Sequence, residues 1–96
     1  MPYMIEQTID GTAGGTIAVN SELRVSQIVI AGRTGGTITI TGTPVGGDVV
    51  EAITGGSLDL SSERLLNISG ASMESFTLTP SATGDDMTVT ITQWPV

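Results

Sequence analysis

The sequence predicts one all-β domain over residues 1–96, an antiparallel β-sandwich or jelly roll of about eight short strands. Two observations predict it. Apolar and polar residues alternate with period two along most of the chain, and glycine-rich turn signals separate the alternating runs. This alternation is typical of an antiparallel sheet with one buried and one solvent-facing side. Glycine supplies the positive φ that hairpin turns need.

The alternating runs give the strands in chain order. The strand candidates are 4–9, 16–19, 23–30, 37–41, 48–53, 57–60, 64–68, 75–79 and 87–92. The strand candidate 23–30 changes the phase of its alternation, since its apolar residues stand at odd positions up to Val25, whereas both of its isoleucines, beginning with Ile28, stand at even positions. A β-bulge near Ser26–Gln27 reconciles the two halves, and a strand buried on both faces would also fit. No helix is expected, because the best helical window, 61–66, meets Gly70 within about two turns.

The inward positions of the clearest runs predict a mainly aliphatic core. They are Ile38, Ile40, Phe76, Leu78, Met87, Val89 and Ile91. Aromatic residues are scarce, so aliphatic side chains, many of them β-branched, supply most of the buried volume, and these suit a pleated, half-buried surface.

A faint repeat suggests a second architecture. Glycine pairs beginning at Gly14, Gly35 and Gly55 each precede a small hydroxyl residue and alternating aliphatics. A period of about twenty residues could indicate a solenoid. Two strands with their turns have the same length, and the residues between the three copies differ. Hairpins that reuse one turn chemistry are therefore the favoured interpretation.

Composition excludes several functions. The chain has no cysteine and no histidine, which removes disulfides, the commonest general base and the commonest transition-metal ligand. The formal net charge is −7, and the only basic residues are Arg24, Arg33 and Arg64. Binding to nucleic acid or to an anionic membrane is therefore not expected. No signal peptide or membrane span is recognised, so synthesis in a cytoplasm is expected.

Two patterns suggest a ligand, and each has a simpler interpretation. Thr-x-Thr runs, as in 37–41 and 88–92, could match an ice lattice, but threonine is also a favoured solvent-facing strand residue. Asp85–Asp86, with Asp48 or Asp10, could hold calcium, but an Asp pair after a glycine is more typical of a hairpin turn. We therefore predict no catalytic residue, no cofactor and no metal site.

The lack of lysine is the strongest functional signal. Sandwich proteins usually guard their edge strands with lysine, proline or inward-pointing charge. The prolines of this chain, Pro2, Pro44, Pro80 and Pro95, lie at the termini or in expected loops. Unguarded edges are expected to be covered by another subunit or another protein. The chain is therefore expected to belong to an oligomer or a lattice, with a homo-trimer favoured.

Segments 35–47 and 87–96 carry a family resemblance. They read Gly-Gly-Thr-Ile-Thr-Ile-Thr-Gly-Thr-Pro-Val-Gly-Gly and Met-Thr-Val-Thr-Ile-Thr-Gln-Trp-Pro-Val, and the whole chain resembles in style the small β-sandwich virion proteins of tailed bacteriophages. The resemblance implies a capsid decoration (cement) or head–tail accessory protein. Such a protein is made in the host cytoplasm, resides in the virion and has a capsid or tail lattice as its partner.

The termini are the expected contact elements, with 1–6 as an N-terminal contact arm. Tyr3 and Trp94 are large rings near the chain ends, and aromatic residues are enriched at interface centres. Both rings could instead plug the ends of the sandwich. The predicted contact residues are Tyr3, Ile5, Trp94 and Val96. The alternative functions are a carbohydrate- or receptor-binding module of a phage tail and an ice-binding or solenoid protein; an enzyme ranks last.

Overall fold

The fold consists of antiparallel strands. The computed structural model describes residues 2–33, 35–47 and 51–95. Its strands are β1 (Tyr3–Ile9), β2 (Gly15–Ala18), β3 (Arg24–Ala31), β4 (Thr37–Pro44), β5 (Glu51–Asp59), β6 (Leu65–Pro80) and β7 (Met87–Trp94). Within these described ranges, no helix is long and apolar enough to span a membrane. The all-β prediction is confirmed.

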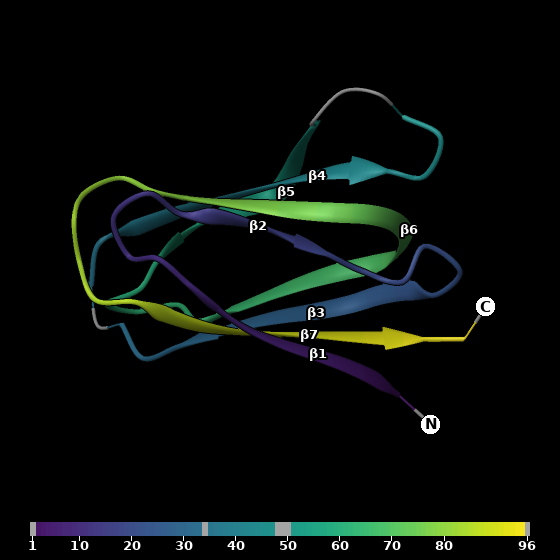
Figure 1. Cartoon of the computed structure of the whole chain (residues 1–96), viewed down its shortest axis with the longest axis horizontal. Helices are drawn as coiled ribbons and strands as arrows, with labels where there is room; N and C mark the ends of the chain where they lie inside the picture. Colours follow the sequence, from purple (N-terminus) through teal and green to yellow (C-terminus); the bar gives the residue numbers. More distant parts are fainter. Residues whose placement is uncertain (1, 34, 48–50, 96) are drawn as a thin grey trace.

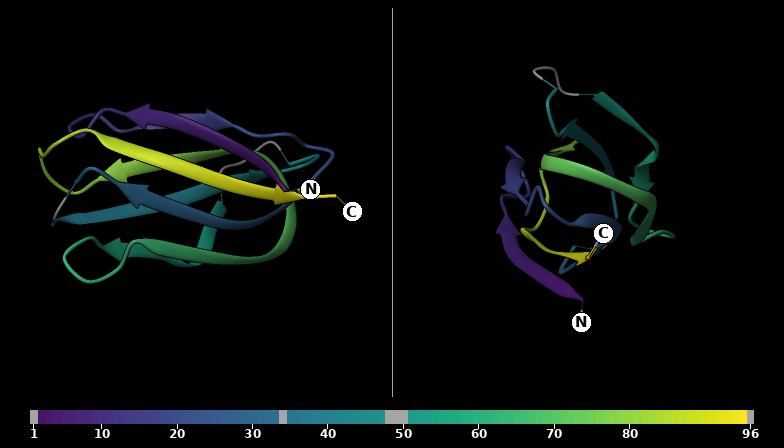
Figure 2. Two further views of the ribbon diagram at one scale, coloured as in Figure 1. Left: turned by 90° about the horizontal axis from the view of Figure 1, so that it is seen from below. Right: turned by 90° about the vertical axis from the view of Figure 1, so that its right-hand side faces the viewer.

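The strand order is that of a jelly roll. One sheet runs β1-β7-β3-β6-β4-β5, and β2 pairs with β6 beside this path. The strand β6 has 16 residues, of which the first half pairs with β3 and the second half with β2 and β4. Because β6 bends between its halves, the sheet folds over into two layers (Figure 1 and Figure 2). One layer holds β1, β7, β3 and the first half of β6; the other holds β2, β4, β5 and the second half.

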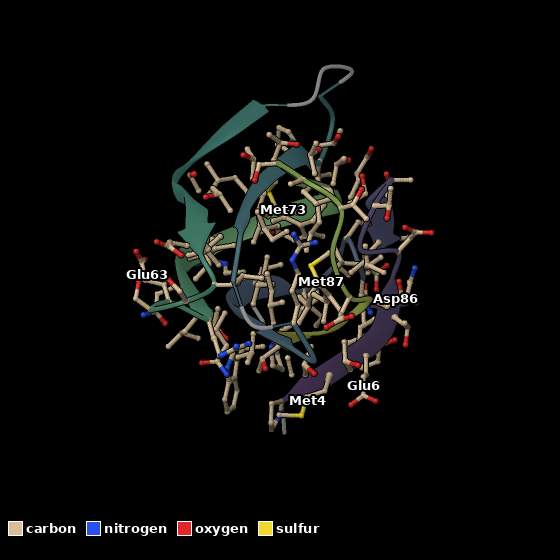
Figure 3. All side chains as sticks on the ribbon, turned by 90° about the vertical axis from the view of Figure 1, so that its left-hand side faces the viewer. Met4, Glu6, Glu63, Met73, Asp86 and Met87 are labelled. Atoms are coloured by element: carbon tan, nitrogen blue, oxygen red, sulfur yellow. The ribbon has the colours of Figure 1, made fainter. Side chains whose placement is uncertain are left out.

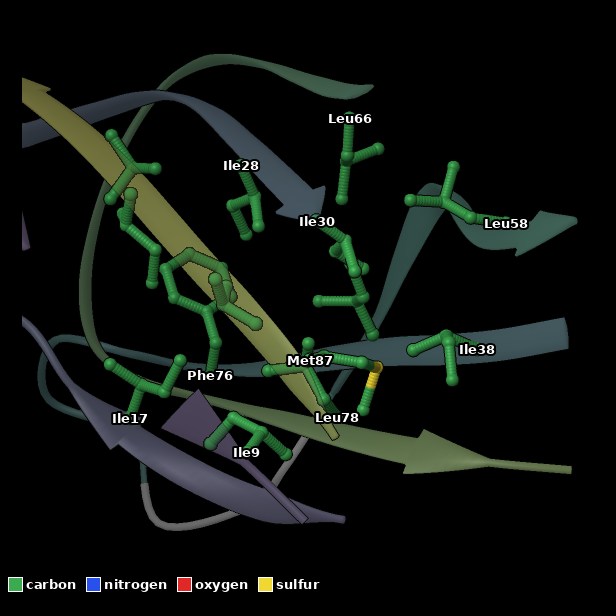
Figure 4. Close-up of a cluster of buried hydrophobic side chains, with 14 of the residues drawn as sticks. Ile9, Ile17, Ile28, Ile30, Ile38, Leu58, Leu66, Phe76, Leu78 and Met87 are labelled. Atoms are coloured by element: carbon green, nitrogen blue, oxygen red, sulfur yellow. The ribbon is translucent and has the colours of Figure 1, made fainter. Parts of the chain in front are cut away.

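The core lies between the two layers and is mainly aliphatic (Figure 4). Its buried side chains are Ile9, Ile17, Val25, Ile28, Ile30, Ile38, Ile40, Leu58, Leu60, Leu66, Met73, Phe76, Leu78, Met87, Val89 and Ile91. Every inward position predicted from the clearest runs is among them. Figure 3 shows the same division, with Met73 and Met87 between the layers and Met4 and Glu6 projecting outward from β1.

The phase change in β3 is a β-bulge, as predicted. Against β7, Val25 pairs with Gln93 and Gln27 with Thr92, which leaves Ser26 as the extra residue. The register against β6 also shifts at this point, but there the additional residues lie on β6. Val25 and Ile28 are both buried as a result. Because the bulge restores the inward alternation, the strand does not have to be buried on both faces.

Two glycine-containing segments differ from the sequence-based expectation. The sequence predicts separate strands at 64–68 and 75–79, whereas the structure joins them into β6 without a turn. The sequence also predicts a turn at Gly55–Gly56, but both residues lie inside β5, where the register against β4 is irregular. Gly55 has a φ of 76°, a left-handed conformation that costs glycine little. The third of the glycine pairs that recur about every twenty residues therefore marks an irregularity within a strand and not a turn. The strand order is that of a folded antiparallel sheet, so the fold is not a solenoid.

Arg33 holds together the loops at one end of the sandwich. Its side chain is only 4% exposed, and its guanidinium donates hydrogen bonds to the carbonyl oxygens of Gly11 (2.7 Å), Gly35 (3.1 Å) and Ala82 (3.0 Å). These carbonyls belong to three different loops. A Cβ atom at Gly84 would overlap the guanidinium, so a loop also packs directly on it. Arg33 is therefore a structural clamp.

Gln93 makes the corresponding connection at the opposite end. Its side chain is fully buried, its Oε1 accepts a hydrogen bond from the Asn20 N–H (3.0 Å), and its Nε2 donates to the Asn20 carbonyl (2.8 Å). Asn20 lies in the loop between β2 and β3. One buried amide thus satisfies both backbone groups of Asn20 and fixes this loop to the end of β7.

Two loop carboxylates stabilise their own turns. The carboxylate of Asp59 accepts hydrogen bonds from the hydroxyl (2.7 Å) and the N–H (3.0 Å) of Ser61. The carboxylate of Asp10 accepts from the N–H groups of Thr12 (2.7 Å) and Ala13 (3.0 Å). The Ser61 hydroxyl, followed by its N–H, lowers the pKa of Asp59; the N–H of Ala13, followed by that of Thr12, lowers the pKa of Asp10.

We expect Asp59→Asn to remove an acid-dependent part of the stability. Because the folded-state pKa of Asp59 lies below its unfolded-state value, the carboxylate stabilises the fold above the unfolded-state pKa. This stabilisation is lost as the pH falls through the folded-state pKa. The melting temperatures of the wild type and the variant should therefore differ at about pH 7 and converge in acid, once the pH lies below the folded-state pKa of Asp59. A difference that does not change with pH would contradict this role of Asp59.

Candidate protein-contact face

The layer that contains β1 and β7 presents one side to solvent, which we term the outer face. Its side chains alternate with the buried ones along each strand. They are Met4, Glu6 and Thr8 on β1, Thr88, Thr90, Thr92 and Trp94 on β7, Arg24, Gln27, Val29 and Ala31 on β3, and Leu65 and Asn67 on β6. The register aligns them in rows across the layer, such as Met4–Thr92–Gln27–Asn67 and Glu6–Thr90–Val29–Leu65.

Large apolar side chains are exposed on the outer face. Met4 is 61% exposed, and Leu65 and Trp94 are each 46% exposed. Among the outward residues that the structure describes, only Glu6 and Arg24 are charged, although the chain has a net charge of −7. An exposed apolar surface rimmed by polar groups is typical of a protein-interaction site.

Thr92, at the centre of the outer face, carries a buried hydroxyl without a partner. Its side chain is 5% exposed, and its Oγ1 accepts and donates no hydrogen bond within the described residues. In the register it lies between Met4 and Gln27. A buried polar group left without a partner costs about 1–3 kcal/mol.

Thr92→Val should therefore raise the free energy of unfolding by about 1 kcal/mol, because valine keeps the β-branched shape and removes the hydroxyl. Urea denaturation should show a higher midpoint with an unchanged m-value. Thr90→Val, at a half-buried position on the same strand, is the matched control and should change the stability by less than about 0.5 kcal/mol. A destabilised Thr92→Val would show that this hydroxyl has a partner in solution.

The structure brings two of the predicted contact residues to one end of the sandwich. Tyr3 begins β1 and Trp94 ends β7, so both lie where the two chain ends meet (Figure 1 and Figure 2). They are exposed on different sides of the layer, because Tyr3 pairs with Gln93, whose side chain points inward, whereas Trp94 points outward. Ile5 is half-buried and packs against the core, and Val96 lies outside the described residues. Their role in binding stays a prediction.

Met4 and Leu65 belong to the outer face and are not among the four predicted contact residues, although Met4 lies within the predicted contact arm 1–6. The alternation of β1 contained the signal for Met4, which is out of phase with Ile5 and Ile9. The alternation of residues 65–68 contained the signal for Leu65, because Leu66 is in phase with Ile68 whereas Leu65 is in phase with the polar Asn67. The register against β3 agrees, since it aligns Leu65 with the outward Val29.

The strand β1 is an edge of its layer. Its 7 residues pair with β7 in uninterrupted register, from Tyr3 opposite Gln93 to Ile9 opposite Met87. It contains no proline and no bulge, and Glu6 is its one charged residue. The features that usually protect an edge are therefore sparse, as the lack of lysine predicts. From Tyr3 onward, the predicted contact arm 1–6 is part of this edge strand.

The second layer carries a different outward surface, made mainly of hydroxyl side chains. The register forms the rows Ala18–Ser75–Thr43, Thr16–Thr77–Thr41 and Thr79–Thr39–Ser57. Within each row, residues on neighbouring strands are about 4.8 Å apart, but sheet twist rotates each strand against the next. Solvent-facing strands rich in threonine give the same pattern. Whether this surface binds ice is measured by thermal hysteresis of the purified chain.

The aspartates considered for calcium have other roles in the structure. Asp86 Oδ1 accepts a hydrogen bond from the Gly11 N–H (3.0 Å), and Asp10 stabilises its own turn. Asp85 is exposed, and Asp48 lies outside the described residues. Across the part of the chain that the structure describes, no group of three or more His, Cys, Asp or Glu side chains is placed to hold a metal ion.

Comparison with known proteins gives a fold relationship. No protein-family model matches the chain, and no curated protein matches it. Among solved structures, it is similar to the Drosophila NLP-core, with a TM-score of 0.57 and 14% sequence identity over 96% of this chain and 96% of that chain. The NLP-core structure is described as providing insight into pentamer formation and histone binding. At this identity the likeness shows a shared fold.

Proposed function

We propose that this chain is a non-enzymatic structural protein that acts through protein–protein contacts, as a capsid-associated decoration or stabilising protein of a tailed bacteriophage. The outer face carries the protein-contact part of the proposal, because exposed apolar side chains lie there on a nearly uncharged surface beside an open edge strand. The virion part is supported by the resemblance of the sequence to small phage β-sandwich proteins.

Self-assembly is part of the proposal. A protein of this fold, the Drosophila NLP-core, is described in terms of pentamer formation, which supports assembly of the present chain into a homo-oligomer. Size-exclusion chromatography with light scattering, over a wide range of concentrations, tests this with the full chain. A defined oligomer is expected. A monomer at every concentration would contradict self-assembly.

Binding of a basic protein is a second candidate function. The loop end that Arg33 clamps has the exposed acidic residues Asp10, Asp59, Glu63, Asp85 and Asp86, and Figure 3 views the molecule from this end. The NLP-core, which shares the fold, is described in terms of histone binding. Negative charge gathered at one pole attracts cationic partners. Saturable binding of a labelled oligolysine peptide that persists at about 0.15 M salt would support this function, and its loss at that salt would reject it.

A further inference from the structure

We propose that the outer face binds a second copy of this chain, face to face around a twofold axis, with Glu6 of each copy against Arg24 of the other. This inference rests on the proposed protein-contact function and names its partner. In an interface between two identical surfaces, a contact from residue i to residue j is always matched by one from j to i. A face with one acidic and one basic residue can therefore complement itself.

Glu6 and Arg24 cannot neutralise each other within one copy. Glu6 lies on β1 in the row of Thr90, and Arg24 lies on β3 in the row of Trp94, with β7 between them. Two strand spacings and four residues along a strand place their Cα atoms about 16 Å apart. The two side chains are too short to close this Cα separation and bring a nitrogen and an oxygen within the 4 Å of an ion pair. Both side chains are exposed, so each is available to a partner.

The same axis also matches the apolar side chains of the face. On a flat grid with strands about 4.8 Å apart and alternate residues about 6.8 Å apart, the axis that exchanges Glu6 and Arg24 passes through Thr92 and continues to Leu65. Because the twofold axis lies in the plane between the two faces, each residue of one copy lies opposite the mirror image, across this line, of its position on the other copy. This places Met4 of one copy close to Trp94 of the other and brings the two Leu65 side chains together. Sulfur–aromatic contacts of this kind are favourable. The three exposed apolar residues thus gain partners together with the two charges.

A second copy fits this face better than pairing through the edge strand does. Antiparallel pairing of β1 with another β1, centred on its middle residue, would set Glu6 against Glu6, and like charges directly opposite are destabilising. Face-to-face packing instead sets opposite charges together. It also keeps Asp86 away from the contact, because Asp86 precedes the first residue of β7 whereas Trp94 and Arg24 lie toward the opposite end.

Charge reversal in the full chain provides the test. Glu6→Arg and Arg24→Glu should each raise the dimer Kd at least about tenfold, because each places like charges together at both symmetry-related contacts. The double variant E6R/R24E should return the Kd to within about threefold of the wild type, because it restores the ion pairs in reverse. Glu22→Arg, an equal charge change in an exposed loop outside the outer face, is the control and should leave the Kd unchanged.

Trp94 supplies a second readout, since it is the only tryptophan of the chain. Its emission should shift to longer wavelength when the wild type is diluted, as dimers dissociate and expose the ring. The Glu6→Arg variant should show the long-wavelength spectrum at all concentrations while circular dichroism confirms that it is folded. An oligomer that both single reversals leave intact, or that the double variant does not restore, overturns this interface and leaves the proposed self-assembly standing. A wild type that stays monomeric overturns both.

Discussion

Replacing Arg33 with methionine is expected to lower the free energy of unfolding by about 3 kcal/mol, a large share of the stability of a small domain. The guanidinium is buried, and it provides the hydrogen bonds that the carbonyls of Gly11, Gly35 and Ala82 accept from three separate loops. Methionine fills part of the volume but donates nothing, so these carbonyls must turn to water and the loops must separate. Arg33→Lys should also destabilise, because an ammonium lacks the planar fork that reaches three directions.

The control for this prediction is Arg64→Met. Arg64 is half-buried and donates one hydrogen bond, to the Ile30 carbonyl (3.2 Å), so its loss should cost about 1 kcal/mol. Urea denaturation of the wild type and the three variants gives the comparison. Burying a charge without a counter-charge has a desolvation cost that opposes these hydrogen bonds. An Arg33→Met variant as stable as the wild type would show that this cost cancels them.

Much of the fold follows from the sequence, because the period-two pattern fixes which side of each strand is buried. Ile38, Ile40, Val89 and Ile91 are predicted and found in the core, and the phase change between Val25 and Ile28 locates the bulge. The continuity of β6 cannot be predicted from the sequence. One bent strand over Leu65–Pro80 and two strands joined by a turn both show the alternation seen at 64–68 and at 75–79. Only the pairing partners of each half, β3 for one and β2 and β4 for the other, distinguish them.

The candidate site is less predictable than the fold for a related reason. A contact face is defined by residues from strands that are distant in the sequence, and the register that aligns Met4, Thr92 and Gln27 depends on the bulge and the strand order. Their positions near the chain ends predict Tyr3 and Trp94 as contact residues, but composition cannot show that they lie on different sides of one layer. Arg33 likewise looks like any surface arginine until the loops around it are known.

We expect Gln93→Met to destabilise the fold by about 2 kcal/mol. The side chain is fully buried, and its amide satisfies both the N–H and the carbonyl of Asn20. Methionine is similar in length and is tolerated in apolar cores, so the loss should come from the two backbone groups and not from a cavity. The loop between β2 and β3 should open first, because this amide pair ties it to β7. Hydrogen exchange of the Asn20 amide should then accelerate more than that of amides in the centre of β7.

The matched control is Gln7→Met, the same chemical change at an exposed position of β1, which should alter the stability by less than about 0.5 kcal/mol. If both variants lose the same stability, the effect at position 93 is that of an ordinary substitution in a strand. The two hydrogen bonds between the Gln93 amide and the Asn20 backbone then do not hold the loop to β7. If Gln93→Met is strongly destabilised but the exchange of the Asn20 amide is unchanged, the cost comes from packing around the thioether and not from the lost hydrogen bonds. A selective loss of protection at Asn20, together with a neutral Gln7→Met, is the outcome that follows from a buried amide that binds both backbone groups of one residue.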